Sequence, residues 1–249
     1  GFKVDVEPGQ GEYSLSEIFA YMEKSDYRCF VAFDEFQTIA SYADKNVEAL
    51  LRSHIQRLTN VNFIFSGSQR HVLENMFASA SRPFYQSTQM MPLGDIDKSA
   101  YYAFSSDKMR NNRQSIDEET FDYLYTKLSS HTWYVHTLLN RLYESGYETI
   151  DKTTVEDIMA DILLENEGTF QTFLRLVTPI QAKVLYAIAS EGTIKEIQGK
   201  TFLTKYRLGA ASTVKTAVKS LVEKELLLDN NGEYQIYDRF FGIWLIGNN

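Results

Sequence analysis

A chain of 249 residues with 44% hydrophobic content carries enough apolar material for one large domain or a few small ones. It has no long apolar run and no basic-then-apolar N-terminal segment, so we expect neither membrane insertion nor secretion. The net charge of −8 argues against a protein that coats nucleic acid over its whole surface. The only cysteine, Cys29, cannot form an internal disulfide, which fits a reducing cytoplasm.

The first residues predict a strand and then a helix. Lys3 to Val6 has the pattern of a short strand. Ser14 follows as the expected helix N-cap, and Glu17 stands three residues later, where a capping box is completed. We therefore expect a helix of about ten residues from Ser14.

The run from Cys29 to Phe33 is followed directly by two carboxylates. Five consecutive apolar residues cannot alternate between core and water, so they predict a strand buried on both faces of a parallel sheet. Ligands sit beyond the carboxyl ends of such strands. The pattern is that of a Walker B strand, in which Asp34 holds Mg²⁺ through water and Glu35 polarises the water that attacks ATP. The alternative is that Asp34 and Glu35 only cap the next helix.

A second buried strand is predicted from Asn62 to Phe65, after a helical period from Asn46 to Leu58. Strand, helix, strand and helix in this order predict a parallel sheet.

The second strand ends in Ser66, Gly67 and Ser68. A polar side chain at the carboxyl end of the strand next to the predicted Walker B strand can form a hydrogen bond with the terminal phosphate of ATP or with the attacking water. Ser66 and Ser68 are therefore candidates for a sensor role, and Gly67 permits close backbone approach. The alternative, which can hold together with the first, is an ordinary turn in which Ser68 caps a helix from Gln69 to Phe77.

Strand signals stop after a last short extended piece from Arg82 to Gly94. Helical periods then predict an all-helical lid domain, with helices at Ile96–Phe104, Asp117–Leu128, Trp133–Tyr143 and Val155–Glu165. Its many aromatic side chains recur at helical spacing, which favours core packing over base stacking.

A new module is predicted to begin at Thr178-Pro179, because threonine is a good N-cap and proline suits the first helical turn. After this helix come a segment from Thr201 to Leu208 and a helix from Ser212 to Glu225.

Two short strands, Leu226–Leu228 and Tyr234–Tyr237, then flank a turn with asparagine and glycine where positive φ is needed. Three helices and a hairpin of this size predict a winged helix-turn-helix with Ser212 to Lys224 as the recognition helix.

The winged helix segment is mildly basic. Between residues 195 and 224, seven cations are opposed only by Glu196 and Glu223; they are Lys195, Lys200, Lys205, Arg207, Lys215, Lys219 and Lys224. Such a patch can face phosphates, and Ser212, Lys215 and Lys219 are the candidate DNA contacts. The alternatives are solvated lysines on an ordinary surface helix and a module that docks a protein or inhibits the chain itself.

The sequence contains no phosphate-binding GxxxxGK[ST] motif. Gly199-Lys200-Thr201 resembles its end, but Ile194 stands where the first glycine is required, and a helical rather than a strand pattern precedes it. An ATPase core that has a Walker B strand also needs a P-loop to bind the phosphates of ATP. We therefore expect a P-loop upstream of this segment, and we expect no ATPase activity from the segment alone.

Several ordered motifs resemble the archaeal-type ATPases found also in Bacteroidetes, within the signal-transducing branch of AAA+-related P-loop NTPases. They are Phe33-Asp34-Glu35-Phe36-Gln37, Leu51-Arg52 with Ile55-Gln56, Phe63-Ile64-Phe65-Ser66-Gly67-Ser68, Pro83-Phe84-Tyr85, Trp133-Tyr134-Val135 and Tyr237-Asp238-Arg239-Phe240-Phe241 with Trp244. The resemblance covers nearly the whole chain.

This resemblance implies a cytoplasmic ATP-binding protein with a partial αβ ATPase core (residues 1–94), a helical lid (95–177) and a C-terminal winged helix (178–249). The stretch after Tyr85 often carries arginine in such proteins but here reads Gln86-Ser87-Thr88. No arginine finger is assigned there, and Arg52, Arg70 and Arg82 remain candidates.

The favoured function is therefore a nucleotide-controlled regulator, in which binding of ATP and Mg²⁺ between core and lid changes the exposure of the winged helix. The alternative is a DNA-binding or protein-docking regulator without ATP hydrolysis. DNA, a protein partner or a second copy of the chain could each be the target, and the sequence does not select among them.

Overall fold

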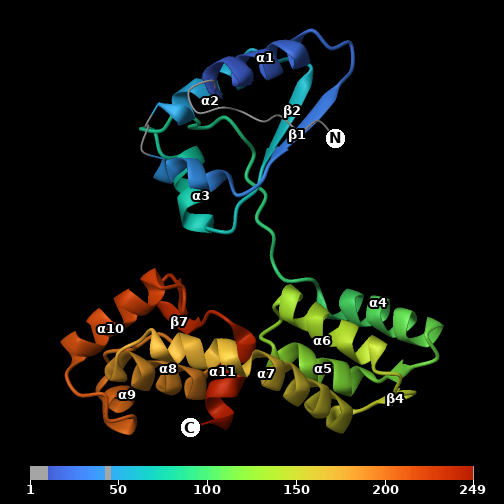
Figure 1. Ribbon diagram of the computed structural model, residues 1–249, viewed down its shortest axis with the longest axis vertical. Helices are drawn as coiled ribbons and strands as arrows, with labels where there is room; N and C mark the ends of the chain where they lie inside the picture. Colours follow the sequence, from blue (N-terminus) through green and yellow to red (C-terminus); the bar gives the residue numbers. More distant parts are fainter. Residues whose placement is uncertain (1–10, 43–45, 249) are drawn as a thin grey trace. The chain divides into compact units, whose positions relative to one another are not determined.

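The computed structural model describes residues 11–42 and 46–248 of the chain. It divides into two compact units, an N-terminal unit of residues 1–92 and a C-terminal unit of residues 93–249, and each is described by itself (Figure 1). The predicted strand from Lys3 to Val6 lies outside the described residues. The predicted lid and winged helix share one hydrophobic core within the C-terminal unit, so the division at residues 177 and 178 stays a prediction.

The N-terminal unit alternates helices and strands. Its elements are α1 (Gly11–Glu23), β1 (Cys29–Phe33), the 3-10 helix η1 (Phe36–Ser41), α2 (Val47–Ile55), β2 (Val61–Phe65) and α3 (Arg70–Ala78). β1 and β2 pair in parallel, with Phe33 opposite Phe65, which confirms the predicted parallel sheet. Ser14 lies inside α1, so its prediction as the N-cap is wrong.

Helices cover one face of this two-stranded sheet. The core beneath it joins side chains of α1, η1, α2 and α3 to Phe33, Phe63 and Phe65, and Figure 1 shows the helices gathered on one side of the strands. On the other face Phe30 is 69% and Ile64 is 55% exposed. Because alternate residues of a strand point to opposite faces, the prediction of burial on both faces is wrong for the described residues.

The segment after α3 folds into turns. The Tyr85 N–H donates to the Arg82 carbonyl at 3.1 Å and the Ser87 N–H to the Phe84 carbonyl at 3.1 Å. The Phe84 ring is fully buried against Phe36, Phe65 and Phe77. The prediction of an extended piece from Arg82 is therefore wrong over these residues, because the buried ring needs the chain to turn back onto the core.

The helical part of the C-terminal unit is longer than predicted. Its elements are α4 (Lys98–Asn111), β3 (Ser115–Ile116), α5 (Glu118–Lys127), α6 (Thr132–Glu144), β4 (Thr149–Ile150) and α7 (Lys152–Arg175). α4 and α7 run well past their predicted ends. β3 and β4 form a short parallel pair that the sequence did not predict.

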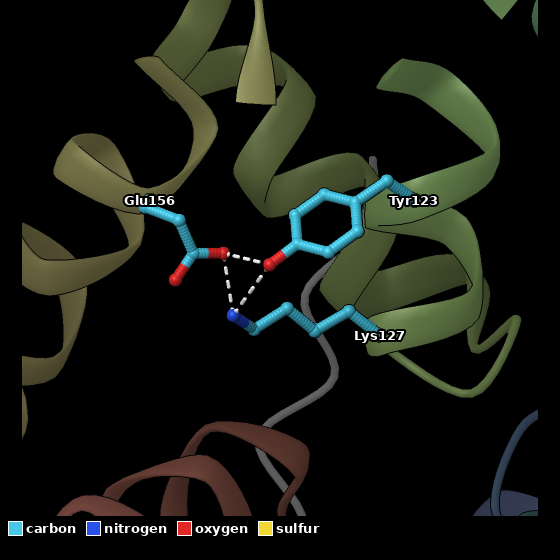
Figure 2. A network of polar contacts seen from close by, with 3 residues as sticks. All are labelled: Tyr123, Lys127 and Glu156. Atoms are coloured by element: carbon cyan, nitrogen blue, oxygen red, sulfur yellow. Dashed lines mark hydrogen bonds and ion pairs between the residues drawn. The ribbon is translucent and has the colours of Figure 1, made fainter. Parts of the chain in front are cut away.

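A polar network joins α5 to α7 on the surface of this part (Figure 2). The Lys127 ammonium donates to the Tyr123 hydroxyl at 3.0 Å and to the Glu156 carboxylate, which also accepts from Tyr123. Burial raises the pKa of Glu156, but the hydrogen bonds from Lys127 and Tyr123 outweigh it and leave that pKa below its usual range. The network fastens α5 and α7 over the apolar core beneath them.

The winged helix part follows α7. Its elements are α8 (Pro179–Glu191), β5 (Thr193–Ile194), α9 (Lys200–Lys205), α10 (Ala211–Glu223), β6 (Leu227–Asn230), β7 (Glu233–Ile236) and α11 (Arg239–Gly247). Thr178 caps α8 through a capping box with Gln181, as predicted from its place before proline. Asn231 and Gly232 have φ of 55° and 86°, which confirms the predicted hairpin turn.

Two elements of the winged helix were not predicted. β5 pairs with β7 and makes a three-stranded sheet in the order β5-β7-β6. The Phe240 ring of α11 packs against the Tyr134 ring of α6, with 5.1 Å between the ring centroids. The motifs that contain Tyr134 and Phe240 are more than a hundred residues apart in the sequence and meet in one core. Burial in this contact raises the pKa of Tyr134 to about 12. Across residues 11–42 and 46–248, the helices are too short or too polar to cross a bilayer.

Candidate functional site

The carboxyl ends of β1 and β2 bring Asp34 and Ser66 together. The strand pairing continues one step further, because the Ser66 N–H donates to the Phe33 carbonyl at 2.9 Å and the Phe36 N–H to the Ser66 carbonyl at 2.9 Å. The Ser66 hydroxyl donates a hydrogen bond to Asp34 Oδ1 at 2.7 Å, and the Glu35 N–H donates to the same oxygen at 3.0 Å. One oxygen of the exposed Asp34 carboxylate is thereby fixed.

Glu35 and Ser68 form a second pair beside the first. The Ser68 hydroxyl donates to Glu35 Oε2 at 2.9 Å. Glu35 has φ 49° and ψ 40°, in the left-handed region that non-glycine residues seldom occupy. All four residues predicted from the two strand ends, Asp34, Glu35, Ser66 and Ser68, therefore lie in one hydrogen-bonded group.

The alternative explanations of these residues as helix caps do not match the contacts. Glu35 occupies the N-cap position of η1, but its side chain makes no capping hydrogen bond. The N-cap of α3 is Gln69, and the Ser68 hydroxyl is bonded to Glu35 instead. The prediction that Ser68 caps the helix is wrong.

Gln37 belongs to the same group, although the sequence analysis did not select it as a site residue. Its side chain is buried, and its amide nitrogen donates to Glu35 and lies 3.4 Å from the Ser68 hydroxyl. Its position two residues after Glu35 in the Asp-Glu-Phe-Gln motif is the one sequence feature that could have indicated a contact with Glu35. Only the turn of η1, in which the Thr38 N–H donates to the Glu35 carbonyl at 2.9 Å, folds it back onto the carboxylate.

Two of the three candidate arginines, Arg52 and Arg82, have contacts within the N-terminal unit. Arg82 pairs with the buried Glu48 of α2 at 3.0 Å, and Arg52 lies over the Phe84 ring at 5.9 Å from its centroid. Burial raises the pKa of Glu48, and the charge of Arg82 partly opposes that rise. Nothing is described for the side chain of Arg70.

The acidic and hydroxyl oxygens at the strand ends do not form a metal cage by themselves. Over residues 11–42 and 46–248, no group of three or more His, Cys, Asp and Glu side chains could hold a metal ion. Magnesium in nucleotide sites typically takes one or two carboxylates, with phosphates and water completing its shell. The pair of exposed carboxylates with an adjacent hydroxyl fits that mode of binding.

The DNA-contact candidates lie on α10 in the C-terminal unit. Ser212, Lys215 and Lys219 are exposed along this helix, which begins at Ala211. The surrounding basic patch is smaller than its sequence suggests, because Lys205 pairs with Glu191 at 2.7 Å and Lys224 donates to the Leu176 carbonyl at 2.8 Å.

Comparison with known proteins agrees with this architecture. Residues 168–247 match a family model described as a probable winged helix domain. The Walker-type ATPase of Pyrococcus abyssi is 17% identical, with a TM-score of 0.62 over 98% of this chain and 73% of that chain. The ORC2 protein of Aeropyrum pernix, in a structure of its ADPNP and ADP complexes, is 13% identical, with a TM-score of 0.51 over 99% of this chain and 72% of that chain.

Curated protein sequences give no match. The likeness to the two solved structures concerns the fold, and the family model identifies the C-terminal segment. The chain thus shares a mixed α/β fold with the Walker-type ATPase of Pyrococcus abyssi and the ORC2 protein of Aeropyrum pernix, and it carries a C-terminal winged helix domain.

Proposed function

We propose that the full-length protein is a magnesium-dependent ATP hydrolase of the AAA+-related class, with its reaction site at the carboxyl ends of β1 and β2. The observation that carries this proposal is the hydrogen-bonded pairing of two carboxylates from one strand end with two hydroxyls from the next. The fold shared with a protein named as a Walker-type ATPase, and with one solved with ADPNP and ADP, supports it.

Each residue has a distinct role in this proposal. Ser66 and the Glu35 N–H hold Asp34 Oδ1, which leaves the second oxygen for a magnesium-bound water. Mg²⁺ bound with ATP would neutralise charge on the phosphate oxygens. Glu35 accepts a proton from the attacking water, and Ser66 and Ser68 sense the terminal phosphate.

The phosphate cradle is not part of this sequence, which has no GxxxxGK[ST] motif. Backbone amides and the lysine of such a loop supply most phosphate contacts. We therefore propose that these 249 residues alone bind ATP weakly and act as the catalytic-carboxylate and regulatory part of a cytoplasmic ATPase.

Nucleotide binding with and without magnesium tests the role of Asp34. In the full-length protein, Asp34→Asn should weaken ATP binding about tenfold or more in the presence of Mg²⁺ and leave binding in EDTA nearly unchanged. Asp26→Asn, at an exposed acidic residue of the same unit, is the matched control. Equal magnesium dependence in Asp34→Asn and wild type would remove Asp34 from the site.

DNA contact by the winged helix is a second candidate role. It is favoured by the exposed Lys215 and Lys219, which stand one turn apart on α10 in a segment that matches a winged helix model. Replacing both lysines by alanine should weaken binding to all duplexes alike and reduce the slope of log affinity against log salt by about two. If the wild type shows no shift of random duplex at low salt, DNA contact is excluded. If the module docks protein, the double variant should alter ATPase rate or complex formation without any effect on DNA.

A further inference from the structure

A buried glutamine side chain contacts an exposed carboxylate of the candidate site. Gln37 is 5% exposed, yet its amide nitrogen donates to Oε2 of the exposed Glu35 carboxylate and lies 3.4 Å from the Ser68 hydroxyl. Ser68 donates to the same carboxylate oxygen at 2.9 Å. Two donors therefore converge on one oxygen, and no described residue donates to the other oxygen, Oε1.

The orientation of the Gln37 amide follows from its partner. An ionised carboxylate only accepts hydrogen bonds, so the NH₂ group must face Glu35 and the amide oxygen must face away. That oxygen is buried without a hydrogen-bond partner. A buried acceptor without a donor destabilises a fold, so the amide is poorly explained by packing and well explained by its contact with Glu35.

Gly67 makes room for this amide. A Cβ atom at Gly67 would lie 2.0 Å from the Gln37 amide oxygen and 3.1 Å from its amide carbon. Gly67 does not have positive φ, so its backbone conformation is open to other residues. The absence of a Cβ at Gly67 therefore leaves the space that the end of the Gln37 side chain occupies, and the turn itself does not need a glycine.

We infer that Gln37 is a positioning residue that holds Glu35 by Oε2 and directs Oε1 at the attacking water, with Gly67 as the residue that admits it. The inference rests on the proposed function, in which Glu35 is the base. The left-handed backbone of Glu35 and the turn of η1 bring the two side chains together within two residues. A base with one oxygen fixed keeps the other in a single orientation, which is the geometric requirement for proton transfer.

The first test replaces the amide by an apolar side chain of similar length. In the full-length protein, Gln37→Met should lower kcat about tenfold or more while KM for ATP changes less than about twofold, because only the reacting water loses its oriented base. Gln56→Met, at an exposed glutamine of the same unit, is the control.

The second test uses the contact between Gly67 and Gln37. Gly67→Ala should displace the amide and lower kcat as much as Gln37→Ala does, and the double variant should be no slower than Gln37→Ala alone. Gly94→Ala, where an added Cβ meets nothing within 4 Å, should leave kcat unchanged. If the two substitutions only loosened the packing, their effects on kcat would add in the double variant, and KM for ATP would change together with kcat.

The outcomes distinguish failure of this inference from failure of the proposed function on which it rests. If Glu35→Gln lowers turnover while Gln37→Met and Gly67→Ala keep kcat within about twofold of wild type, Gln37 does not position the base. If Glu35→Gln itself leaves turnover unchanged, the proposed function fails and the inference fails with it. Should Gln37→Met not fold, Gly67→Ala and the double variant decide, because the alanine Cβ displaces only the flexible end of Gln37.

Discussion

The helices of the two units begin in different ways. In the C-terminal unit, five of the eight described helices, α4, α5, α7, α8 and α11, start at a residue whose side chain accepts a hydrogen bond from the first turn, whereas α6, α9 and α10 have no side-chain cap. The capping residues are Asp97, Asp117, Asp151, Thr178 and Asp238. In the N-terminal unit, η1, α2 and α3 have no side-chain cap. Short polar side chains in the C-terminal unit therefore stabilise helix ends, whereas those beside β1 and β2 bond to each other.

Buried polar atoms show the same difference. Among the described residues, four of the buried side-chain atoms without a hydrogen-bond partner lie in the N-terminal unit, on Gln37, Glu48, Arg82 and Thr88. Arg239 supplies the one in the C-terminal unit. Each such atom destabilises the folded state, and of the four only Gln37 belongs to the group at the ends of β1 and β2.

Breaking the buried ion pair should have the largest effect on stability. We expect Arg82→Met to destabilise the N-terminal unit by about 2–3 kcal/mol at pH 7, less than for a fully buried pair because Arg82 is 29% exposed. Both tryptophans, Trp133 and Trp244, lie in the C-terminal unit, so urea unfolding followed by circular dichroism but not by tryptophan fluorescence should report the loss.

The loss should also depend on pH. Because burial raises the pKa of Glu48, the folded unit holds that proton more tightly than the unfolded chain, and stability falls as pH rises past the ordinary glutamate range. Removing Arg82 strengthens this fall, so the destabilisation by Arg82→Met should be smaller at pH 5 than at pH 7. Glu48→Gln should flatten the dependence, and an equal loss at both pH values would contradict the buried pair.

Removing a helix cap should have a smaller effect, confined to the other unit. Thr178→Ala breaks the capping box with Gln181 and should destabilise the C-terminal unit by about 1 kcal/mol, seen by tryptophan fluorescence. Thr216→Ala, at an exposed threonine inside α10, should change stability by less than about 0.5 kcal/mol. Equal effects of the two substitutions would show that caps do not set the stability of this unit.

Local sequence signals predicted elements whose cause is local. Thr178-Pro179 marked the start of α8 and Asn231-Gly232 marked the hairpin turn, because each needs only neighbouring backbone geometry. The apolar runs of β1 and β2 and their polar ends predicted the group of Asp34, Glu35, Ser66 and Ser68, since parallel strands end at the same edge.

The remaining features depend on contacts that sequence periodicity does not encode. An apolar run does not reveal that, within residues 11–42 and 46–248, helices cover one face of the β1-β2 sheet and leave Phe30 and Ile64 exposed on the other. β5 is too short for a strand signal. The ion pair of Arg82 with Glu48 joins residues more than thirty positions apart in the sequence, and no local pattern predicts it. Gln37 was missed for a related reason, since its role depends on the turn of η1 and on the space beside Gly67.

The most direct measurement is ATP turnover and ATP affinity of Glu35→Gln in the full-length protein. The substitution keeps the size of the side chain and removes the basic carboxylate. If Glu35 is the base held at the ends of β1 and β2, turnover should fall about a hundredfold or more while ATP affinity stays nearly intact. Unchanged turnover would contradict the account and leave Glu35 with a purely structural contact to Ser68 and Gln37.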